Sequence, residues 1–360
     1  MTDDGTSNRG PGRDARSSPA PRPRLERRPL DLPLRHAWTI ARGSSASKTN
    51  VVVRVSQGGL AGLGEAAPNA RYGEDWRSVM VCLDRIEPLL GDDLSDWAGT
   101  LDRIEAALPD GHAARAAVDI ALHDLAAQRD GVPLWRLMGA DPSSMPCTSF
   151  SIGLDAIPVM QQKVREAAAF PILKVKLGSD DDRAVVEGIR AVTDKPLYVD
   201  ANEGWRDPER AIAMIGWLAG MGVTLVEQPL PAADLEGARR VRAGSRLPIY
   251  ADEAALRVAD VGRIHDAYDG INIKVQKSGG LRPARRMLEA ARERGMQVMI
   301  GCMIETSIGI TAAAHLAPLF DRADLDGNLL LAADPFRGAV ARDGRLLLTD
   351  RPGLGVEGGW

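Results

Sequence analysis

Residues 172–200 read ILKVKLGSDDDRAVVEGIRAVTDKPLYVD, and this stretch decides the predicted fold. It contains an apolar run at 172–177, a segment rich in charged and small residues, and a second apolar run at 197–200. Apolar runs of about four to eight residues are typical of buried strands, whereas longer periodic segments are typical of helices. The stretch therefore predicts two parallel strands joined by a helix, because parallel strands require such a crossover.

The same unit repeats on both sides of this stretch. Further apolar runs occur at 147–152, 224–227, 249–252, 271–275 and 297–300, and a last strand is expected near Asp324. Helical stretches rich in Ala, Arg and Glu, such as 282–294, lie between them. Eight such units of about 25 residues predict an α/β fold, a (β/α) barrel of TIM type over residues 146–334. An open doubly wound sheet is the alternative, but no Gly-rich fingerprint follows the first strand.

The residues before the barrel follow a different pattern. The β-branched run 51–55, the turn at 57–59 and the run 60–65 predict a hairpin. An Ala-rich segment at 112–129 has apolar residues at helical spacing and ends before Gly131 and Pro133. Strands followed by helices predict an α+β domain over residues 25–135. We interpret residues 1–24 as a disordered tail, with a basic docking arm as the alternative.

Composition excludes several classes of function. The net charge of −4 gives no electrostatic basis for binding nucleic acid or an anionic membrane. No apolar run approaches the roughly 18 residues that span a bilayer. The first 28 residues hold seven arginines and no apolar core, so we expect no signal peptide. Cys82, Cys147 and Cys302 are odd in number and far apart, which favours a reducing, cytoplasmic setting.

Three acidic residues, Asp200, Glu227 and Asp252, end three consecutive predicted strands. Because parallel barrel strands all end at the same rim, these carboxylates are expected to converge. Crowded carboxylates repel one another unless a cation lies between them, and an all-oxygen site without His or Cys favours Mg²⁺. The alternative is three solvent-exposed acids paired with nearby arginines.

Lysines lie at the ends of two other predicted strands. Lys174 and Lys176 are two residues apart and so face the same side of one strand, whereas Lys274 ends the sixth strand, across the barrel. A lysine beside another ammonium group has a lowered pKa and can act as a base near neutral pH. Two such lysines could remove a proton from a carbon next to a carboxylate and return it on the other face, through a metal-stabilised enediolate. A phosphate site or a surface pair is the alternative. Lys277 is expected to face away, as a structural residue.

Five motifs in order resemble the muconate-lactonizing subgroup of the enolase superfamily. They are LKVKLG (173–178), VDANEGW (199–205), VEQPL (226–230), ADE (251–253) and NIK (272–274), and the resemblance covers residues 25–340. HDL (123–125) with GVPL (131–134) resembles the capping domain of that family, to which residues 335–360 are expected to return. The resemblance implies Asp200, Glu227 and Asp252 as Mg²⁺ ligands, Lys176 and Lys274 as the acid/base pair, and Lys174 as a cation that steadies the substrate's negative charge.

Two later motifs are similar to the dipeptide epimerases of this subgroup. They are GCMIETS (301–307) and DLD (324–326). The resemblance implies that Asp324 and Asp326 hold the α-ammonium group of a dipeptide, although the second motif alone could be an acidic turn. The implied function is reversible epimerisation of an L-Ala-Glu-like dipeptide at its second residue.

Three further residues, Ser151, Cys302 and Arg42, are expected to lie near the substrate. The alternatives are a structural role for Cys302 and a solvent-exposed position for Arg42.

Four other functions are compatible with the same barrel. They are those of N-succinylamino acid racemase, o-succinylbenzoate synthase, muconate cycloisomerase and a non-catalytic ligand-binding relative. The first two often have a Pro-Gly-Arg-like stretch where this chain has VQK (275–277). Barrels of this kind often form homo-oligomers, a possibility that the sequence leaves open.

Overall fold

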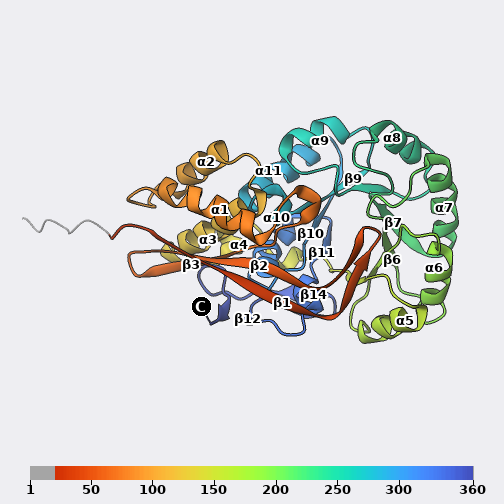
Figure 1. Ribbon diagram of the computed structural model, residues 1–360, viewed down its shortest axis with the longest axis horizontal. Coiled ribbons are helices and arrows are strands. Elements are labelled where there is room, and N and C mark those ends of the chain that lie inside the picture. The colour runs from red at the N-terminus through yellow and green to blue at the C-terminus, as the bar shows by residue number, and fades with distance from the viewer. Residues whose placement is uncertain (1–20, 360) are drawn as a thin grey trace, which may run out of the picture.

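The computed structural model describes residues 21–359, so residues 1–20 of the predicted tail lie outside the described part (Figure 1). Its centre is an eight-stranded parallel sheet in which each strand pairs with the next along the chain. The strands are β4 (Phe150–Ile152), β5 (Leu173–Lys176), β6 (Leu197–Asp200), β7 (Val223–Glu227), β8 (Ile249–Ala251), β9 (Gly270–Lys274), β10 (Gln297–Gly301) and β11 (Arg322–Asp324).

The sheet closes into a barrel. Thr148, just before β4, forms a parallel bridge with Ala323 of β11, and the amide of Ser149 donates to the carbonyl of Ala323 at 3.1 Å. The predicted barrel is therefore confirmed, and the open sheet is excluded. Its outer helices are α5 (Ile157–Glu166), α6 (Asp182–Arg190), α7 (Pro208–Gly220), α8 (Leu235–Gly244), α9 (Val258–Ile264), α11 (Leu281–Arg292) and α12 (Ser307–Leu316).

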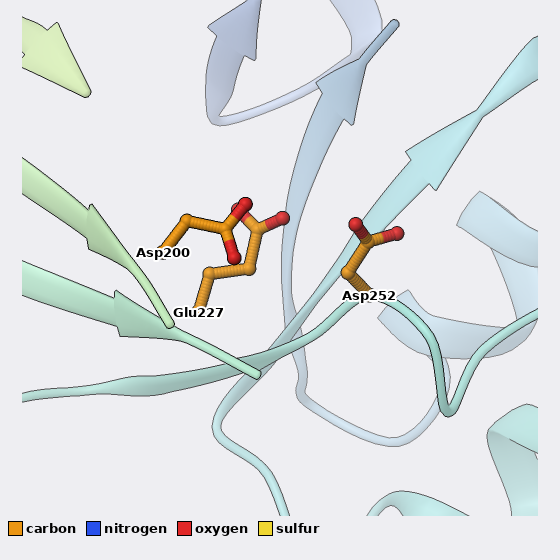
Figure 2. Close-up of side chains that lie close together, drawn as sticks. All are labelled: Asp200, Glu227 and Asp252. Atoms are coloured by element: carbon orange, nitrogen blue, oxygen red, sulfur yellow. The ribbon is translucent and has the colours of Figure 1, made fainter. Parts of the chain in front are cut away.

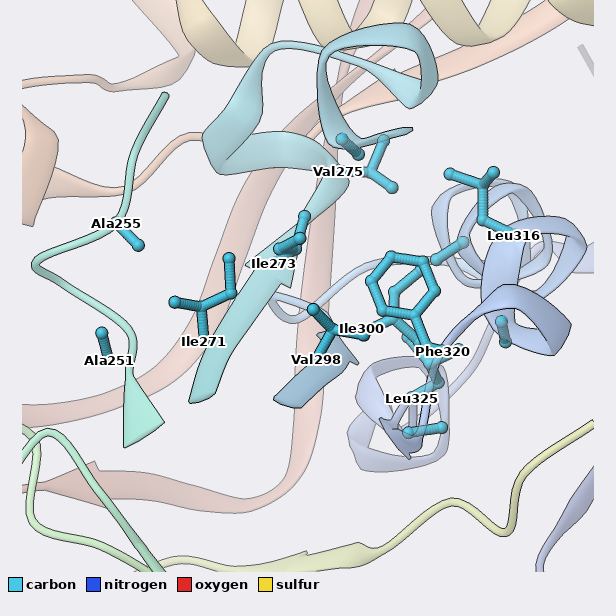
Figure 3. Packing of buried hydrophobic residues seen from close by; sticks show 14 of the residues in the cluster. Ala251, Ala255, Ile271, Ile273, Val275, Val298, Ile300, Leu316, Phe320 and Leu325 are labelled. Atoms are coloured by element: carbon cyan, nitrogen blue, oxygen red, sulfur yellow. The ribbon is translucent and has the colours of Figure 1, made fainter. Parts of the chain in front are cut away.

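The alternation of side chains along each strand separates the core from the site. In β9, Ile271 and Ile273 point outward to the helices, whereas Asn272 and Lys274 point into the barrel, as the two-residue period of a strand requires. Figure 3 shows the outward set packed against helix and loop residues. Inside the barrel, the end where the strands begin is filled by Tyr198, Leu225, Tyr250 and Met299. The polar side chains that point inward lie at the other end, where the strands finish.

One predicted strand ends earlier than expected. The run at 271–275 was expected to be extended throughout, but β9 ends at Lys274 and Val275 begins the short helix α10 (Val275–Ser278). Gly279 ends this helix in the left-handed conformation, with φ of 91°. Because glycine has no Cβ, it adopts this conformation without steric cost. The turn of helix changes where the side chains after Lys274 point.

The N-terminal part is the predicted α+β domain. It contains β1 (Arg24–Ile40), β2 (Gly43–Gln57), β3 (Leu60–Ala66), α1 (Trp76–Ile86), α2 (Trp97–Ala107), α3 (His112–Arg129) and α4 (Leu134–Leu137). Two short 3₁₀ helices, η1 (Ala70–Tyr72) and η2 (Glu87–Leu90), also belong to it. Outside it, η3 (Pro142–Ser144) precedes β4, and η4 (Ala317–Leu319) and η5 (Gly327–Leu330) lie before and after β11.

The predicted hairpin is confirmed. β2 and β3 pair antiparallel, and Gly58 and Gly59 both have positive φ, which suits the tight turn between them. Helix α3 packs very closely on β3, since a Cβ at Gly64 would lie 1.9 Å from the carbonyl oxygen of Ala117. Glycine is thus required there by the packing and not by its φ.

A long hairpin of β1 and β2 extends from this domain across the barrel (Figure 1). Near its tip, Arg42 donates to the carbonyl of Asn202 beyond β6 at 2.8 Å. Nearer its base, Asn50 donates to the carbonyl of Ile304 beyond β10 at 3.0 Å. The hairpin therefore covers the rim at which the strands end, and the N-terminal domain is a cap.

The C-terminal segment contacts the cap. It contains the strand pairs β12 (Phe336–Arg337) with β15 (Glu357–Gly358) and β13 (Val340–Arg342) with β14 (Arg345–Leu347). The amide of Leu354 donates to the Asp124 carboxylate of α3 at 2.7 Å, and the amide of Leu134 donates to the carbonyl of Gly353 at 2.8 Å. These bonds fasten the last residues to the domain that begins the chain.

Candidate active site

The three predicted acids meet at the rim of the barrel (Figure 2). Asp200 ends β6, Glu227 ends β7 and Asp252 follows β8 directly. One carboxylate oxygen of each lies within 4.8 Å of the others, and their exposed fractions are 0%, 0% and 1%. The three acids are buried, so the alternative of solvent-exposed strand ends is wrong.

The protonation of these acids is strongly perturbed. Burial, together with repulsion from Asp200, raises the pKa of Glu227 to about 8. Burial also acts to raise the pKa of Asp200, but attraction to Lys176 and Lys174 outweighs it and lowers that pKa. Near neutral pH the raised pKa therefore favours the protonated form of Glu227 when no metal ion is bound.

This group of acids fits a magnesium ion. Within residues 21–359 it is the one group of His, Cys, Asp or Glu ligands that converges closely enough to hold a metal. Hydrogen bonds orient the carboxylates: the side-chain amide of Asn272 donates to Glu227 at 2.9 Å, and the backbone N–H of Asn202 donates to Asp200 at 2.9 Å. Buried, oriented oxygen ligands without His or Cys suit a hard divalent cation.

The two predicted acid/base lysines lie on opposite sides of the acids. Lys176 comes from β5 and its Nζ is 2.6 Å from the Asp200 Oδ2. Lys274 comes from β9, four strands further round the eight-stranded barrel, and its Nζ is 2.7 Å from the Asp252 Oδ2. Both lysines line one cavity above the acids. The strand positions thus bring the two amines to opposite walls of a shared space.

The expected lowering of the lysine pKa is wrong for Lys274. Burial does lower its pKa, but attraction to Asp252 and Glu227 outweighs burial, so the pKa is raised. Burial and a neighbouring ammonium group were expected to lower this pKa, but the carboxylates beside the amine have the larger effect. These carboxylates are the ones that a bound cation would neutralise.

Lys174 lies deeper than the other two lysines. Its Nζ is 2.8 Å from Glu227 Oε2 and 2.7 Å from Asp324 Oδ2, and its side chain is 1% exposed. It is not among the cavity-lining residues. Lys174 is therefore a buried counter-ion that joins Asp200 and Glu227 to Asp324, and its contact with the substrate's charge stays a prediction.

Lys277 does not face away from the site as expected. Helix α10 turns its side chain back under the rim, where its Nζ donates to Asp252 Oδ1 at 2.6 Å and to the carbonyl of Asp252 at 2.5 Å. A third bond goes to the carbonyl of Asn272 at 3.0 Å, and the side chain is fully buried. Lys277 therefore fixes the orientation of one acid while Lys274 contacts its other oxygen.

We expect Lys277→Met to weaken Mg²⁺ binding by about ten- to a hundred-fold, the usual effect of losing a hydrogen-bond partner of a metal ligand. Titration calorimetry with MgCl₂ measures the change. Lys195→Met is the matched control, since Lys195 donates to the carbonyls of Ala167 and Ala168 away from the rim. An affinity equal to that of the wild-type protein would contradict a positioning role for Lys277.

The last barrel strand brings two more acids to the cavity. Asp324 accepts hydrogen bonds from Lys174 at 2.7 Å and from the Ser149 hydroxyl at 2.6 Å. Asp326 accepts from the backbone amide of Ser151 at 2.6 Å, and no cation lies within ion-pair distance of it in the described chain. Burial and repulsion from Asp324 raise the pKa of Asp326 to about 7. Asp326 is therefore a buried acid without a compensating cation, and a positively charged ligand group would stabilise its ionised form.

The remaining predicted residues also line the cavity, whose volume is about 440 Å³. Ser151 orients Asp326 through its backbone amide. Burial raises the pKa of the Cys302 thiol well above its usual range, so the thiol is neutral. Arg42 is bound by Glu253 at 2.8 Å and by Glu203 at 3.4 Å. Arg42 thus reaches the cavity, but acids of the barrel already neutralise it.

Several cavity residues were missed by the sequence reasoning. Trp38, Lys48, Asn50, Arg71 and Tyr72 all come from the cap. The Trp38 ring lies beneath the Lys176 ammonium, with 5.7 Å between Nζ and the ring centroid. Arg71 forms a bidentate pair with Glu203 at 2.7 and 2.9 Å. No local motif marks these residues, since their position depends on how the cap crosses the rim.

Two family models match most of the chain. Residues 27–139 match the mandelate racemase / muconate lactonizing enzyme N-terminal domain, and residues 159–358 match the enolase C-terminal domain-like family. The chain belongs to this family of the enolase superfamily, as the sequence motifs predicted.

Epimerases are among the proteins that this chain resembles. The chain is 42% identical to the L-Ala-D/L-Glu epimerase of Bacteroides thetaiotaomicron, over 91% of this chain and 86% of that protein. A substrate-liganded L-Ala-D/L-Glu epimerase from Bacillus subtilis superimposes with a TM-score of 0.89 at 32% identity, covering 94% of this chain and 99% of that one. A dipeptide epimerase from Enterococcus faecalis, complexed with Mg and L-Leu-L-Tyr, gives 0.86 at 33% identity, covering 94% and 99%.

The comparisons and the site together confirm two further predictions. The chain is an isomerase of the epimerase type, like its relatives. Magnesium is its cofactor, since relatives were solved with Mg and three buried carboxylates converge here. Among residues 21–359 no helix combines the length and apolar character needed to cross a membrane.

Proposed function

We propose that this chain is a Mg²⁺-dependent dipeptide epimerase that inverts the α carbon of the second residue of an L-Ala-Glu-like dipeptide. The observation that carries the proposal is Asp326, a buried carboxylate in the cavity wall with no cation at ion-pair distance in the described residues. An unpaired buried charge is costly, so the group favours a ligand that brings a positive charge.

The two charged ends of a dipeptide complement charges at two places in the cavity. Its α-ammonium group complements Asp326, with Asp324 beside it, and its carboxylate faces the metal site of Asp200, Glu227 and Asp252. When bound there, Mg²⁺ supplies positive charge that makes the neighbouring α proton more acidic. The α carbon of the second residue then lies between the two charged ends, in the region that the two lysines flank.

The two lysines act on opposite faces of this carbon: one removes its proton and the other supplies a new one. A neutral amine at Lys176 or Lys274 removes the α proton from one face, and the C–H electron pair is delocalised into the carboxylate as an enediolate. The ammonium group of the other lysine then donates a proton to the opposite face. The configuration is inverted, one lysine has gained a proton and the other has lost one, so the same arrangement runs the reverse reaction.

The alternative functions fit this cavity less well. An N-succinyl amino acid brings a second carboxylate where the dipeptide brings an ammonium group, which places like charges beside Asp326. Muconate has no ammonium group to neutralise this acid. A non-catalytic ligand-binding role does not explain why two lysines lie on opposite sides of three converging acids.

Proton exchange in D₂O tests the proposed function. Purified protein with MgCl₂ and L-Ala-L-Glu is expected to replace the Glu α proton with deuterium and to form L-Ala-D-Glu. Proton NMR follows both changes, since the two diastereomers have separate signals. The absence of epimer from every dipeptide tested, with turnover of N-succinyl-L-Glu, would move the chain to the racemase branch.

We expect L-Ala-L-Glu to have a higher kcat/KM than N-succinyl-L-Glu by at least about ten-fold, because acylation removes the positive charge that Asp326 needs. Asp326→Asn should reduce this preference, and Asp324→Asn in addition should reduce it further. Asp350→Asn is the matched control, since Asp350 is an exposed acid outside the cavity. A preference that survives the Asp326→Asn change would contradict its role in binding the ammonium group.

A further inference from the structure

We propose that Lys48 selects dipeptides whose second residue has an acidic side chain. The inference rests on the proposed function and adds a specificity-determining residue to it. It begins with a comparison of the cationic side chains that line the cavity in the described chain. Five line it, and four are bound to acids of the barrel: Arg42 to Glu253 at 2.8 Å, Arg71 to Glu203 at 2.7 Å, Lys176 to Asp200 at 2.6 Å and Lys274 to Asp252 at 2.7 Å.

Lys48 is the fifth, and it has no acidic partner in the described residues. Its ammonium group forms no ion pair and no hydrogen bond to another side chain or to the backbone there. It is partly buried, and this burial lowers the pKa of the amine below its ordinary value. A partly desolvated cation without a partner favours an anionic ligand, for the same reason that Asp326 favours a cationic one.

The strand register directs Lys48 toward the barrel. Lys48 pairs with Leu32 across β1 and β2, and directly paired residues project from the same face of a sheet. Leu32 is 1% exposed and packs against Ile304 and Leu331 of the barrel loops. Asn50, two residues along the strand, faces the same way and donates to the carbonyl of Ile304. Two neighbours thus fix the direction of the lysine independently.

Its place along the hairpin puts Lys48 above the substrate. The hairpin contacts the loop beyond β6 through Arg42 and the loop beyond β10 through Asn50, and Lys48 lies between these two contacts. In the proposed complex the dipeptide carboxylate faces the metal and its amide runs toward Asp326. The side chain of the second residue is then the substituent that points out of the barrel toward the cap.

The chemistry of Lys48 suits a carboxylate in that position. The other cap cations near the cavity, Arg42 and Arg71, are already paired with Glu253 and Glu203, so their charges are compensated within the protein. A second-residue Glu or Asp gives Lys48 its only partner among the groups described here. A second-residue Lys or Arg would place two cations together in a partly desolvated space.

Kinetics with isosteric dipeptides test the proposal. L-Ala-L-Glu and L-Ala-L-Gln differ only in the side-chain charge, and the wild-type protein is expected to prefer the first in kcat/KM by about ten- to a hundred-fold, the usual range for a charge-assisted hydrogen bond. Lys48→Met should remove this preference by lowering kcat/KM for L-Ala-L-Glu alone, and Lys48→Arg should retain most of it.

The matched control is Arg54→Met, on the same strand. Arg54 is paired with Glu26 and does not line the cavity, so its loss removes the same charge from the cap without affecting the preference. An equal loss of activity on both dipeptides in Lys48→Met, or a wild-type protein that does not distinguish them, would overturn the role of Lys48.

Binding separates this proposal from the proposed function. The affinities of L-Ala-L-Glu and L-Ala-L-Gln for the Mg²⁺-loaded protein can be measured by calorimetry without turnover. If no dipeptide is epimerised but the Glu peptide binds more tightly through Lys48, the epimerase proposal fails and the acidic-ligand proposal stands. Equal affinities in the wild-type protein would overturn the role of Lys48 whatever the activity.

Discussion

Lys176→Met and Lys274→Met are each expected to abolish epimerisation while leaving exchange of the α proton on one face. Each substitution removes the amine on one side of the cavity, where Lys176 lies beside Asp200 and Lys274 beside Asp252. Loss of a general acid or base typically lowers the rate by about 10²- to 10⁴-fold. In D₂O one variant should label L-Ala-L-Glu and the other L-Ala-D-Glu, without conversion between them, as mass spectrometry measures.

Arginine at the same positions separates proton transfer from electrostatics. Lys176→Arg and Lys274→Arg keep the positive charge beside each acid, but a guanidinium group does not lose its proton near neutral pH. Both should therefore be as inactive as the Met variants. Epimerisation by either Arg variant would show that only the positive charge is needed at that position. It would contradict the role of the substituted lysine as a base.

Removal of the metal is expected to have a comparably large effect. Treatment with EDTA should reduce the activity to background, and added Mg²⁺ should restore it, because the three converging carboxylates suit an ion whose positive charge makes the α proton more acidic. Glu227→Gln keeps the shape of one ligand and removes its charge. We expect it to weaken Mg²⁺ binding by at least about a hundred-fold, more than the loss of a residue that merely orients a ligand.

The same site predicts how Mg²⁺ binding depends on pH. The pKa of Glu227 is raised to about 8 in the metal-free protein, above the ordinary value of a glutamate. A raised pKa favours the protonated form in the folded state, so this contribution to stability is present at low pH and is lost as the pH rises through about 8. Mg²⁺ competes with that proton.

The rise in melting temperature on adding Mg²⁺ should therefore grow between pH 6 and pH 8, roughly the range over which Glu227 loses its proton. Differential scanning fluorimetry at fixed MgCl₂ measures it. In Glu227→Gln, which has no titrating group at this position, the rise should be small and independent of pH. A wild-type rise that is constant over this range would contradict the competition between Mg²⁺ and the proton.

The convergence of the acids at the rim could be predicted from the sequence because barrel strands obey simple geometry. Every parallel strand ends at the same rim, so acids that end successive strands must converge, and the residue numbers of Asp200, Glu227 and Asp252 were sufficient to place them together. The two-residue period along β5 likewise predicted that Lys174 and Lys176 face the same side of the strand, and both are buried inside the barrel rim. The sequence did not predict their different depths, which depend on the layer that each residue occupies.

Other parts of the fold could not be predicted from local pattern. β1 contains Pro29 and Pro33, which usually argue against a strand. They are tolerated because β1 is an edge strand of the three-stranded sheet, and the sheet order is a tertiary property. Lys277 was assigned to the wrong face because a turn of helix replaces the extended backbone immediately after Lys274. Residues 275–277 were expected to be extended, and the helical turn that they form reverses the direction of the Lys277 side chain.

The barrel strands and the charged side chains that end them could be predicted from the sequence alone. These features depend on short-range periodicity, which neighbouring residues fix. The tertiary structure alone decided which charges remain unpaired. Arg42 is neutralised by Glu253, whereas Lys48 and Asp326 have no oppositely charged partner in the described residues, because the cap hairpin crosses the rim at one particular place. Pairing between residues that are far apart in the chain depends on that placement, and no local pattern encodes it.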